Sequence, residues 1–287
     1  MQSLVLGTAQ WGSDYGVTNT VGRPSDGALV ELMSLASAPT IAGVGIARLD
    51  TAPVYGDAEE RIRPWASDFS VTTKVAAAGL SSAEVVESIR GSLGRLGVSS
   101  VHGCLVHDWP SLDADGRRVA AAGLADAQSL GLVSSIGVSG YSADDFDRAL
   151  DSFERLDAVQ GPLNALDQRM MTSGVLDRLV SAGCSVQVRS VFLQGLLVGP
   201  IGSSAWAEHP DLARFQAVVA SAGCSALEAA LGFVRQVSGV DEVVVGVTSA
   251  DELREIVAAW AAALPDIDWA RLASSDGSLI DPRTWPR

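Results

Sequence analysis

Paired cysteines, an export signal and long apolar runs are all missing from this chain. Its three cysteines, Cys104, Cys184 and Cys224, are isolated in apolar or small-residue contexts, which predicts buried, reduced thiols without disulfides. The N-terminal segment lacks the basic and apolar regions of an export signal, so we expect a cytoplasmic protein. No uninterrupted apolar run is long enough to cross a bilayer, and no spacing of metal ligands predicts a metal site.

Positive charge is also scarce. The chain has 34 acidic residues against 20 Lys and Arg, a formal net charge of −14, and its pI is near 4.5. Nucleic acids and anionic membranes select basic surfaces, so we expect neither as a partner. Any anionic cofactor must therefore be held by local positive groups and backbone amides. Because no apolar helix face demands a partner, we expect a monomer.

Short apolar runs alternate with longer amphipathic ones, a pattern typical of strands followed by helices. Strands are predicted near residues 3–7, 44–49, 70–74, 101–106, 133–138, 156–160, 184–190 and 242–246. Helices are predicted near 25–37, 57–67, 81–96, 114–130, 142–152, 171–182, 209–220 with 224–237, and 249–263. Eight such units without a linker predict an α/β fold, a single (β/α)8 TIM barrel over residues 1–264. Residues 265–287 are predicted to form a C-terminal tail packed on the barrel.

Two other enzyme architectures are excluded because the sequence lacks the characteristic turn that each of them needs. A doubly wound dinucleotide fold needs a GxGxxG turn after its first strand, and the loop from Gly7 to Gly12 lacks that spacing. The segment around Ser139 is Gly-Val-Ser-Gly-Tyr, which does not form the GxSxG elbow of a hydrolase. The barrel is therefore the preferred interpretation.

Four polar residues end successive predicted strands. Asp50 and Tyr55 follow the second strand, Lys74 ends the third, and His107 follows the fourth. The carboxyl ends of barrel strands converge on one mouth, so these side chains can meet there. Each residue could also have a purely structural role: Asp50 could cap the turn after its strand, and His107 could be a histidine whose hydrogen bonds are satisfied within the fold. Four coincident placements favour a catalytic site instead.

The chemistry of these residue types indicates proton transfer to a carbonyl. A tyrosine can donate a proton near neutral pH if its pKa is lowered from about 10. An ammonium group beside the phenol lowers that pKa, and a carboxylate holds the ammonium in place. A histidine nearby can hydrogen-bond a substrate oxygen. We therefore predict proton delivery by Tyr55, supported by Lys74 and Asp50, while a hydride arrives at the carbonyl carbon.

The motifs around these residues resemble the aldo-keto reductase family. They are Leu6-Gly7-Thr8-Ala9-Gln10-Trp11-Gly12, Asp50-Thr51-Ala52-x-x-Tyr55-Gly56, Thr73-Lys74 and Leu105-Val106-His107. Within the family, the segments 14–16 and 189–197 are similar to short-loop bacterial members. The resemblance runs from about residue 4 to about residue 260. It implies a (β/α)8 fold and reduction of aldehydes or ketones with NADP or NAD as cofactor. Tyr55 would be the general acid, and His107 would orient the carbonyl.

The same resemblance implies a set of cofactor-binding residues after strands one and five to eight. They are Gly7, Thr8, Ala9, Ser139, Gln160, Arg189, Ser190, Phe192, Gln194, Gly195, Gly246, Thr248 and Glu252, with Asn164 as a further contact. Arg189 stands where many relatives have a tyrosine that stacks on the nicotinamide, and its guanidinium plane can stack similarly. Thr248 and Glu252 stand where relatives commonly have Arg and Gln. That Arg usually clasps the 2′-phosphate of NADP, so its absence leaves the choice between NADP and NAD open.

The substrate is predicted to be a small carbonyl compound, sugar-like or an intermediate of secondary metabolism. Trp11, Tyr15 and Trp109 fall on mouth loops and are predicted to form an apolar wall around it. Two alternatives stay open. The altered segment 248–256 suggests a nucleotide-binding regulatory barrel with little turnover. Tyr55 and Lys74 could also transfer protons without hydride, as in a lyase or an epimerase.

Overall fold

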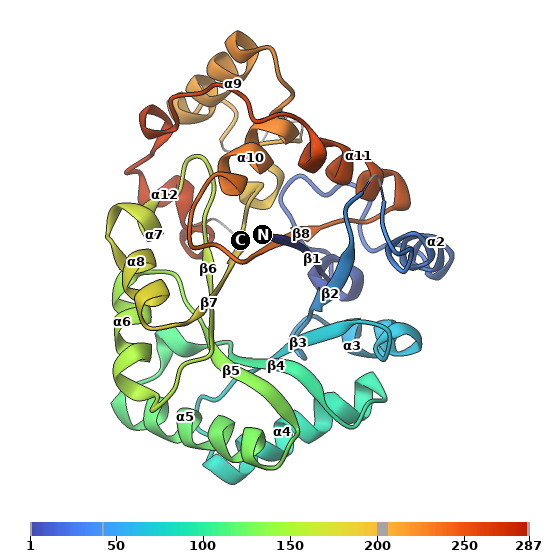
Figure 1. Cartoon of the computed structure of the whole chain (residues 1–287), viewed down its shortest axis with the longest axis vertical. Coiled ribbons are helices and arrows are strands. Elements are labelled where there is room, and N and C mark those ends of the chain that lie inside the picture. The colour runs from blue at the N-terminus through green and yellow to red at the C-terminus, as the bar shows by residue number, and fades with distance from the viewer. Residues whose placement is uncertain (1, 42, 200–205, 286–287) are drawn as a thin grey trace.

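A closed parallel barrel forms the centre of the molecule in the computed structural model, which describes residues 2–41, 43–199 and 206–285. Each strand pairs with its neighbours in sequence order, and β1 pairs with β8 to close the ring (Figure 1). The strands are β1 (Ser3–Gly7), β2 (Ile46–Asp50), β3 (Ser70–Val75), β4 (Val101–Val106), β5 (Val133–Ser139), β6 (Ala158–Pro162), β7 (Ser185–Arg189) and β8 (Glu242–Gly246). This arrangement confirms the predicted (β/α)8 TIM barrel.

Helices surround the barrel and cover the outer face of its strands (Figure 1). They are α1 (Ala9–Gly12), α2 (Asp26–Ala36), α3 (Ala58–Ile62), α4 (Ser82–Leu96), α5 (Ala114–Ser129), α6 (Ala143–Ser152), α7 (Arg169–Thr172), α8 (Val175–Ser181), α9 (Pro210–Ala222), α10 (Ala226–Arg235), α11 (Ala250–Ala261) and α12 (Gly277–Ile280). Of the described helices, none alone is long and apolar enough to cross a bilayer. Only α9 and α10 together meet that criterion, and they are bent by 93°.

Two predicted helices are shorter or divided, for local reasons. The helix expected over 57–67 ends at Ile62, and a 3₁₀ turn with Pro64 follows it, because proline has no backbone donor to continue an α-helix. The helix expected over 171–182 is divided into α7 and α8 at Gly174, whose φ is +71°. Serine caps begin four of the helices: Ser25, Ser81, Ser142 and Ser249 each accept a backbone N–H of the first helical turn.

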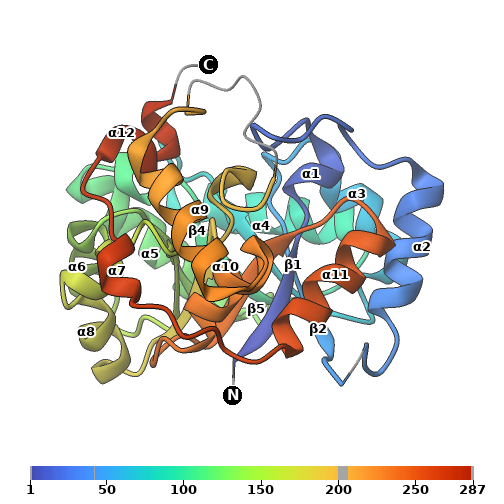
Figure 2. The same ribbon diagram turned by 90° about the horizontal axis from the view of Figure 1, so that it is seen from above.

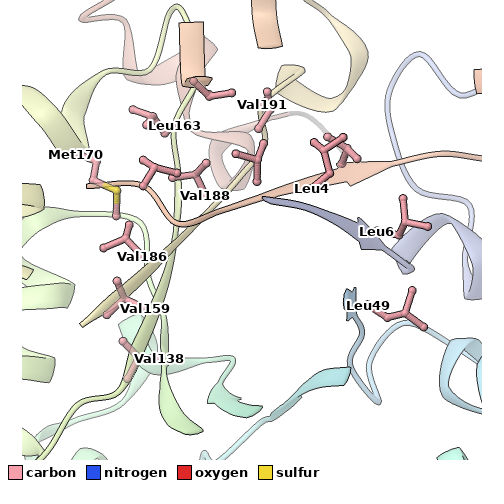
Figure 3. Packing of buried hydrophobic residues seen from close by; sticks show 14 of the residues in the cluster. Leu4, Leu6, Leu49, Val138, Val159, Leu163, Met170, Val186, Val188 and Val191 are labelled. Carbon is pink, nitrogen blue, oxygen red and sulfur yellow. The ribbon is translucent and has the colours of Figure 1, made fainter. Parts of the chain in front are cut away.

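Strand residues that face the helices form the apolar core. Leu6, Leu49, Val138 and Val159 are fully buried, and Figure 3 shows their side chains directed away from the barrel axis. Successive side chains of a strand point to opposite faces, so the alternate residues face the barrel interior. Several of those alternate residues are polar and also buried, namely Asp50, Lys74, Gln160, Gln187 and Glu242. Barrel interiors are more often filled by branched apolar side chains, so this interior is unusually polar.

The segment after residue 264 packs against the barrel by apolar and backbone contacts. Leu272, Leu279 and Trp285 are buried, and the backbone N–H of Ser274 donates to the carbonyl of Leu166 at 2.9 Å. In Figure 2, β1 rises from the foot of the view toward α1, and α12 lies on that upper side. The end of the tail therefore lies near the mouth formed by the carboxyl ends of the strands. The last two residues of the predicted tail, 286 and 287, lie outside the described residues.

Candidate active site

The four residues predicted as catalytic lie together at the carboxyl ends of β2, β3 and β4. Lys74 Nζ donates to the two carboxylate oxygens of Asp50 at 2.8 and 2.7 Å. It also donates to the hydroxyl oxygen of Tyr55 at 3.3 Å. The ring of His107 meets that of Tyr55 edge-on, with centroids 5.7 Å apart and an interplanar angle of 87°. An ammonium group thus lies between a carboxylate and a phenol, with an imidazole beside the phenol.

Close backbone packing fixes the loop that carries Tyr55. A Cβ atom on Gly12 would lie 1.7 Å from the carbonyl oxygen of Tyr55, and one on Gly56 would lie 2.1 Å from the carbonyl oxygen of Gly12. Gly56 also has a φ of +63°, a conformation that other residues rarely adopt. The two glycines let the loops after β1 and β2 touch, and this contact fixes the backbone that carries Tyr55.

Burial and charge decide which of these groups carry protons. Lys74 is the single lysine of the chain. Burial acts to lower its pKa, but Asp50 and Tyr55 outweigh this effect and the pKa is raised, so the side chain is a cation. Burial lowers the pKa of His107 to about 3, and the positive charges of Lys74 and Arg189 act in the same direction. His107 is therefore neutral at physiological pH.

The pKa of Tyr55 differs from the sequence-based prediction. Burial raises it, Lys74 lowers it and Asp50 raises it, and the net result lies above the ordinary value. The predicted lowering is therefore wrong for the protein alone, because Asp50 offsets part of the ammonium charge and desolvation disfavours the phenolate. Tyr55 is consequently a protonated phenol across the neutral range. Because Lys74 donates to its oxygen, the phenol proton remains available to another acceptor.

The residues predicted to bind the cofactor all lie at the same end of the barrel. Gly7, Thr8 and Ala9 follow β1; Ser139 and Gln160 lie on β5 and β6; Arg189, Ser190, Phe192, Gln194 and Gly195 end or follow β7; Gly246, Thr248 and Glu252 end or follow β8. Two features of this end of the barrel fit a polar ligand. The first is that the Oγ1 atoms of Thr8 and Thr51 are buried without a hydrogen-bond partner among the described residues.

The loop after β7 is the second such feature. Ser190, Leu193 and Gln194 have φ values of 58°, 48° and 52°, although none is glycine. Such conformations are costly and concentrate at ligand-binding sites, where surrounding structure holds them. The loop and the orphan hydroxyls together fit a bound dinucleotide, with backbone groups of segment 190–195 along one side.

Two side-chain amides near the mouth are already engaged. Gln160 Nε2 donates to Asp50 Oδ1 at 2.7 Å and also to Gln187, so only its Oε1 is left, at 3.5 Å from the hydroxyl of Ser139. Asn164 uses Nδ2 on the carbonyl of Ser190 at 3.0 Å, and its Oδ1 accepts two backbone N–H groups. Gln160 can therefore offer a cofactor an acceptor, whereas Asn164 shapes the loop after β7.

Arg189 lies against an aromatic ring that the sequence analysis did not single out. Its guanidinium carbon is 4.1 Å from the ring centroid of Tyr141, and that of Arg283 is 3.9 Å from the same centroid. Arg189 also donates to the carbonyl of Gly140 at 3.0 Å. Arg283 is bound to Asp281, but Arg189 forms no salt bridge within the described part of the chain. The mouth therefore contains a cation that is open to an anionic or planar ligand group.

Two predicted substrate contacts are not supported by the structure. The indole rings of Trp11 and Trp109 are both 0% exposed, and their N–H groups donate to the backbone carbonyls of Val247 and Asp145 at 2.7 and 2.8 Å. Both rings lie in the packed layer under the mouth rather than on its wall. Tyr15, the third predicted contact, is 43% exposed and remains a candidate.

The carboxylate of Glu252 occupies the start of the loop before α11. Its Oε2 accepts the backbone N–H of Thr248 at 2.6 Å and the Thr248 hydroxyl at 3.0 Å. Ser249 caps the same helix through the N–H of Glu252. A negative charge therefore lies against Thr248, the position at which the family resemblance implies an arginine.

Known proteins show the same family and fold. The sequence matches the model of the Aldo/keto reductase family over residues 3–276. It is 28% identical over 208 residues to the NADH-specific methylglyoxal reductase of Escherichia coli (strain K12), covering 66% of this chain and 63% of that protein. It is 36% identical over 104 residues to 2,5-diketo-D-gluconic acid reductase B of Corynebacterium sp. (strain SHS752001), covering 34% and 37%. Both alignments span less than two thirds of the curated relative.

Solved structures agree in fold. The glycerol dehydrogenase of Gluconobacter oxydans has a TM-score of 0.72 at 21% identity, over 93% of this chain and 89% of that one. A thermostable aldo-keto reductase in complex with the inhibitor epalrestat has a TM-score of 0.71 at 21% identity, over 95% and 94%. At these identities the likeness establishes the barrel alone. Because the family model spans nearly the whole sequence, the chain belongs to the aldo/keto reductase family.

Proposed function

We propose that this protein is an NAD(P)H-dependent oxidoreductase that reduces an aldehyde or ketone to an alcohol. Tyr55 is the general acid, Lys74 and Asp50 support it, and His107 orients the carbonyl. The observation that carries the proposal is the ammonium of Lys74, held by Asp50 at 2.7 Å and donating to the Tyr55 oxygen at 3.3 Å. The bound nicotinamide would supply the hydride to the carbonyl carbon.

The proton path follows from the donor directions at the site. As the carbonyl oxygen gains negative charge, the phenol of Tyr55 gives it a proton and becomes a phenolate. That phenolate forms beside the ammonium of Lys74, which stabilises it without moving. Neutral His107 has one N–H, which can donate to the same substrate oxygen. Its pKa of about 3 prevents it from acting as the proton source near neutral pH.

Cofactor titration tests this function against its alternatives. The seven tryptophans of the chain allow binding of NADH and NADPH to be followed by fluorescence quenching. A panel of carbonyl compounds is then assayed by the loss of reduced-nucleotide absorbance. Absence of binding for both nucleotides contradicts the proposal, and binding without turnover favours a regulatory barrel. Turnover of a substrate without nucleotide would favour a lyase or epimerase. The monomeric and cytoplasmic states predicted from the sequence stay predictions.

We expect the pH profile of reduction to be flat across the neutral range. Burial raises the pKa of Tyr55 and lowers that of His107 to about 3, so neither group changes its proton occupancy there. The kcat/KM for reduction should fall only above about pH 10, where phenols ordinarily lose their proton. The reverse oxidation needs the phenolate and should rise with pH. Rates in both directions between about pH 5 and 11 check this. An acid limb near the ordinary histidine pKa, removed by His107→Ala, would contradict it.

Glu252 is proposed to favour NADH over NADPH. Its carboxylate engages the amide and hydroxyl of Thr248 and would repel a 2′-phosphate at that place. We expect Glu252→Gln to lower the Kd for NADPH by about tenfold, equal to about 1.4 kcal/mol, with a smaller change for NADH. The NADH-specific relative is consistent with this preference.

Fluorescence titration of both nucleotides measures the ratio without any turnover. Asp251→Asn is the matched control, because this neighbouring carboxylate is exposed and paired with Arg254 at 2.6 Å. An unchanged ratio in Glu252→Gln, or an equal change in the control, would show that Glu252 does not select the cofactor.

A further inference from the structure

A chain of buried hydrogen bonds runs through the inside of the barrel, away from the mouth. It begins at Asp50 on β2, whose Oδ1 accepts from Gln160 Nε2 on β6 at 2.7 Å. In the closed eight-stranded ring, β2 and β6 are separated by three strands on either side. This hydrogen bond therefore spans the interior instead of following the sheet. The carboxylate that holds Lys74 is thus also held from the opposite wall.

The chain continues across β7 and β8. Gln160 Nε2 also donates to Gln187 Oε1, and Gln187 Nε2 donates to Glu242 Oε2 at 2.8 Å. These three residues are opposite one another in the strand register. The three residues are 1%, 5% and 8% exposed, so the contacts are shielded from water. Carboxylates only accept, so both amides must turn their NH₂ groups toward them.

An ion pair completes the chain at the other end of the barrel. Arg48 Nη1 lies 2.6 Å from Glu242 Oε1 and 2.8 Å from His102 Nε2. Burial and Arg48 lower the pKa of His102, so its ring is a neutral acceptor. Glu242 is the first residue of β8 and pairs with Ser3 at the start of β1. Arg48 is two residues before Asp50, on the same face of β2.

Packing alone does not account for this arrangement. Each buried charge loses its hydration, and buried ion pairs often stabilise a fold less than apolar residues of similar size. Apolar layers are the common filling of a barrel interior. Here a buried ion pair, Lys74–Asp50, is joined by two buried glutamines to a second, partly exposed pair, Arg48–Glu242. A costly network that ends on the catalytic carboxylate indicates a role in the chemistry.

We propose that Glu242 and Arg48 are positioning residues, which act through Gln187 and Gln160 to hold Asp50 and to balance the charge around Lys74 and Tyr55. Neither Glu242 nor Arg48 touches the substrate or the reacting atoms. The kinetic consequence rests on the proposed function, whereas the electrostatic consequence can be measured without turnover.

The charged and titratable groups around Lys74 and Tyr55 determine the direction in which each variant should move the pKa of Lys74. Besides Asp50, they are Cys104 on β4, His107 just after it, Arg189 at the end of β7 and Tyr15 from the loop after β1. Asp50 is the only carboxylate among those named, and Glu242 is the next carboxylate along the network. Loss of the Glu242 charge leaves Arg48 unbalanced and should make the proton of Lys74 easier to lose. Loss of the Arg48 charge should have the opposite effect.

The single lysine makes the test direct. Protein labelled with ¹³C-lysine gives one side-chain lysine signal, from Lys74. The ¹³Cε shift is read at fixed pH values from about 10 to about 11.5, because the pKa of Lys74 lies above the ordinary lysine value, while circular dichroism monitors the fold. We expect Glu242→Gln to increase the deprotonated fraction and Arg48→Met to decrease it. The apparent pKa of Lys74 should change by about 0.5 to 1 pH unit, which is less than for a charge in direct contact. The alkaline limb of kcat/KM should move in the same directions.

Two further variants separate positioning from ordinary stability. Val5→Ala is the control, since Val5 is buried on β1 and pairs with Arg48 in register, but carries no charge. The double variant, Glu242→Leu with Arg48→Met, removes both charges together and should return the Lys74 signal to its wild-type position. It can still be measured if one of the single variants fails to fold. The proposal is overturned if the single variants lower the melting temperature, as Val5→Ala does, without moving the Lys74 signal. It is also overturned if both move the signal in the same direction. Because the NMR readout needs no substrate, a failure of the proposed reaction is distinguishable from a failure of this inference.

Discussion

Replacement of Tyr55 by phenylalanine is expected to lower kcat for carbonyl reduction by about 10²- to 10⁴-fold, the contribution of a positioned general acid. The substitution removes the phenol oxygen, which accepts from Lys74 at 3.3 Å, and keeps the ring that meets His107. Nucleotide binding should persist, because the residues proposed to hold the cofactor end or follow β1 and β5 to β8. Steady-state rates at saturating nucleotide, together with fluorescence titration of the nucleotide, measure both quantities.

The other tyrosines provide matched controls for this experiment. The chain has three tyrosines, and Tyr15 and Tyr141 also lie near the mouth. Tyr141→Phe keeps the ring that Arg189 and Arg283 contact, so it should retain most of the activity. If Tyr55→Phe also retains most of the activity, the phenol is not the proton donor, and a water molecule must take its place.

Local patterns along the sequence predict the barrel and bring its candidate catalytic residues to one mouth. Strand and helix periods depend on side-chain alternation, which a single sequence displays directly. The four catalytic candidates could be found because strand ends of a parallel barrel share one mouth. The resemblance to the aldo-keto reductases is confirmed by the family match over residues 3–276. These predictions needed no knowledge of which side chains touch.

The remaining features depend on contacts between distant parts of the chain. The net pKa of Tyr55 depends on how far burial and Asp50 oppose Lys74, and spacing along the chain does not give those strengths. Trp11 and Trp109 were predicted to line the substrate site, but their rings are packed beneath it. Residue type alone does not tell which side of a loop a ring faces. The contact of Arg283 with Tyr141 requires the tail to fold back over the mouth.

The network inside the barrel had a weak signal in the sequence that was not used. Polar residues at alternate positions of buried strands, such as Arg48 with Asp50 and Gln187 with Arg189, indicate a polar interior. The partners across the barrel could not be read from it, because Asp50 and Gln160 are 110 residues apart and meet only when the ring closes. The alternation of side chains along a strand therefore predicts which residues face the barrel interior, whereas the closure of the barrel decides which of them form hydrogen bonds with one another.

Replacement of Lys74 by methionine is expected to abolish most activity and to destabilise the fold. Methionine has similar length but leaves the carboxylate of Asp50 buried, with its main cationic partner removed. Breaking a buried ion pair on one side costs about 3 to 5 kcal/mol, because the remaining charge is uncompensated. Urea unfolding measures this loss, and turnover should fall because the phenolate of Tyr55 would form without an adjacent cation.

The double substitution Lys74→Met with Asp50→Asn separates the two effects. Asparagine still accepts from Gln160 through its carbonyl oxygen, so the network across the barrel keeps its first link. With both charges removed, the unfolding free energy should recover by at least half of the loss in Lys74→Met. Activity should stay low, since no ammonium lies beside the Tyr55 oxygen to stabilise the phenolate. Recovery of activity along with stability would mean that Lys74 serves only to neutralise Asp50, and that Tyr55 donates its proton without help from a cation.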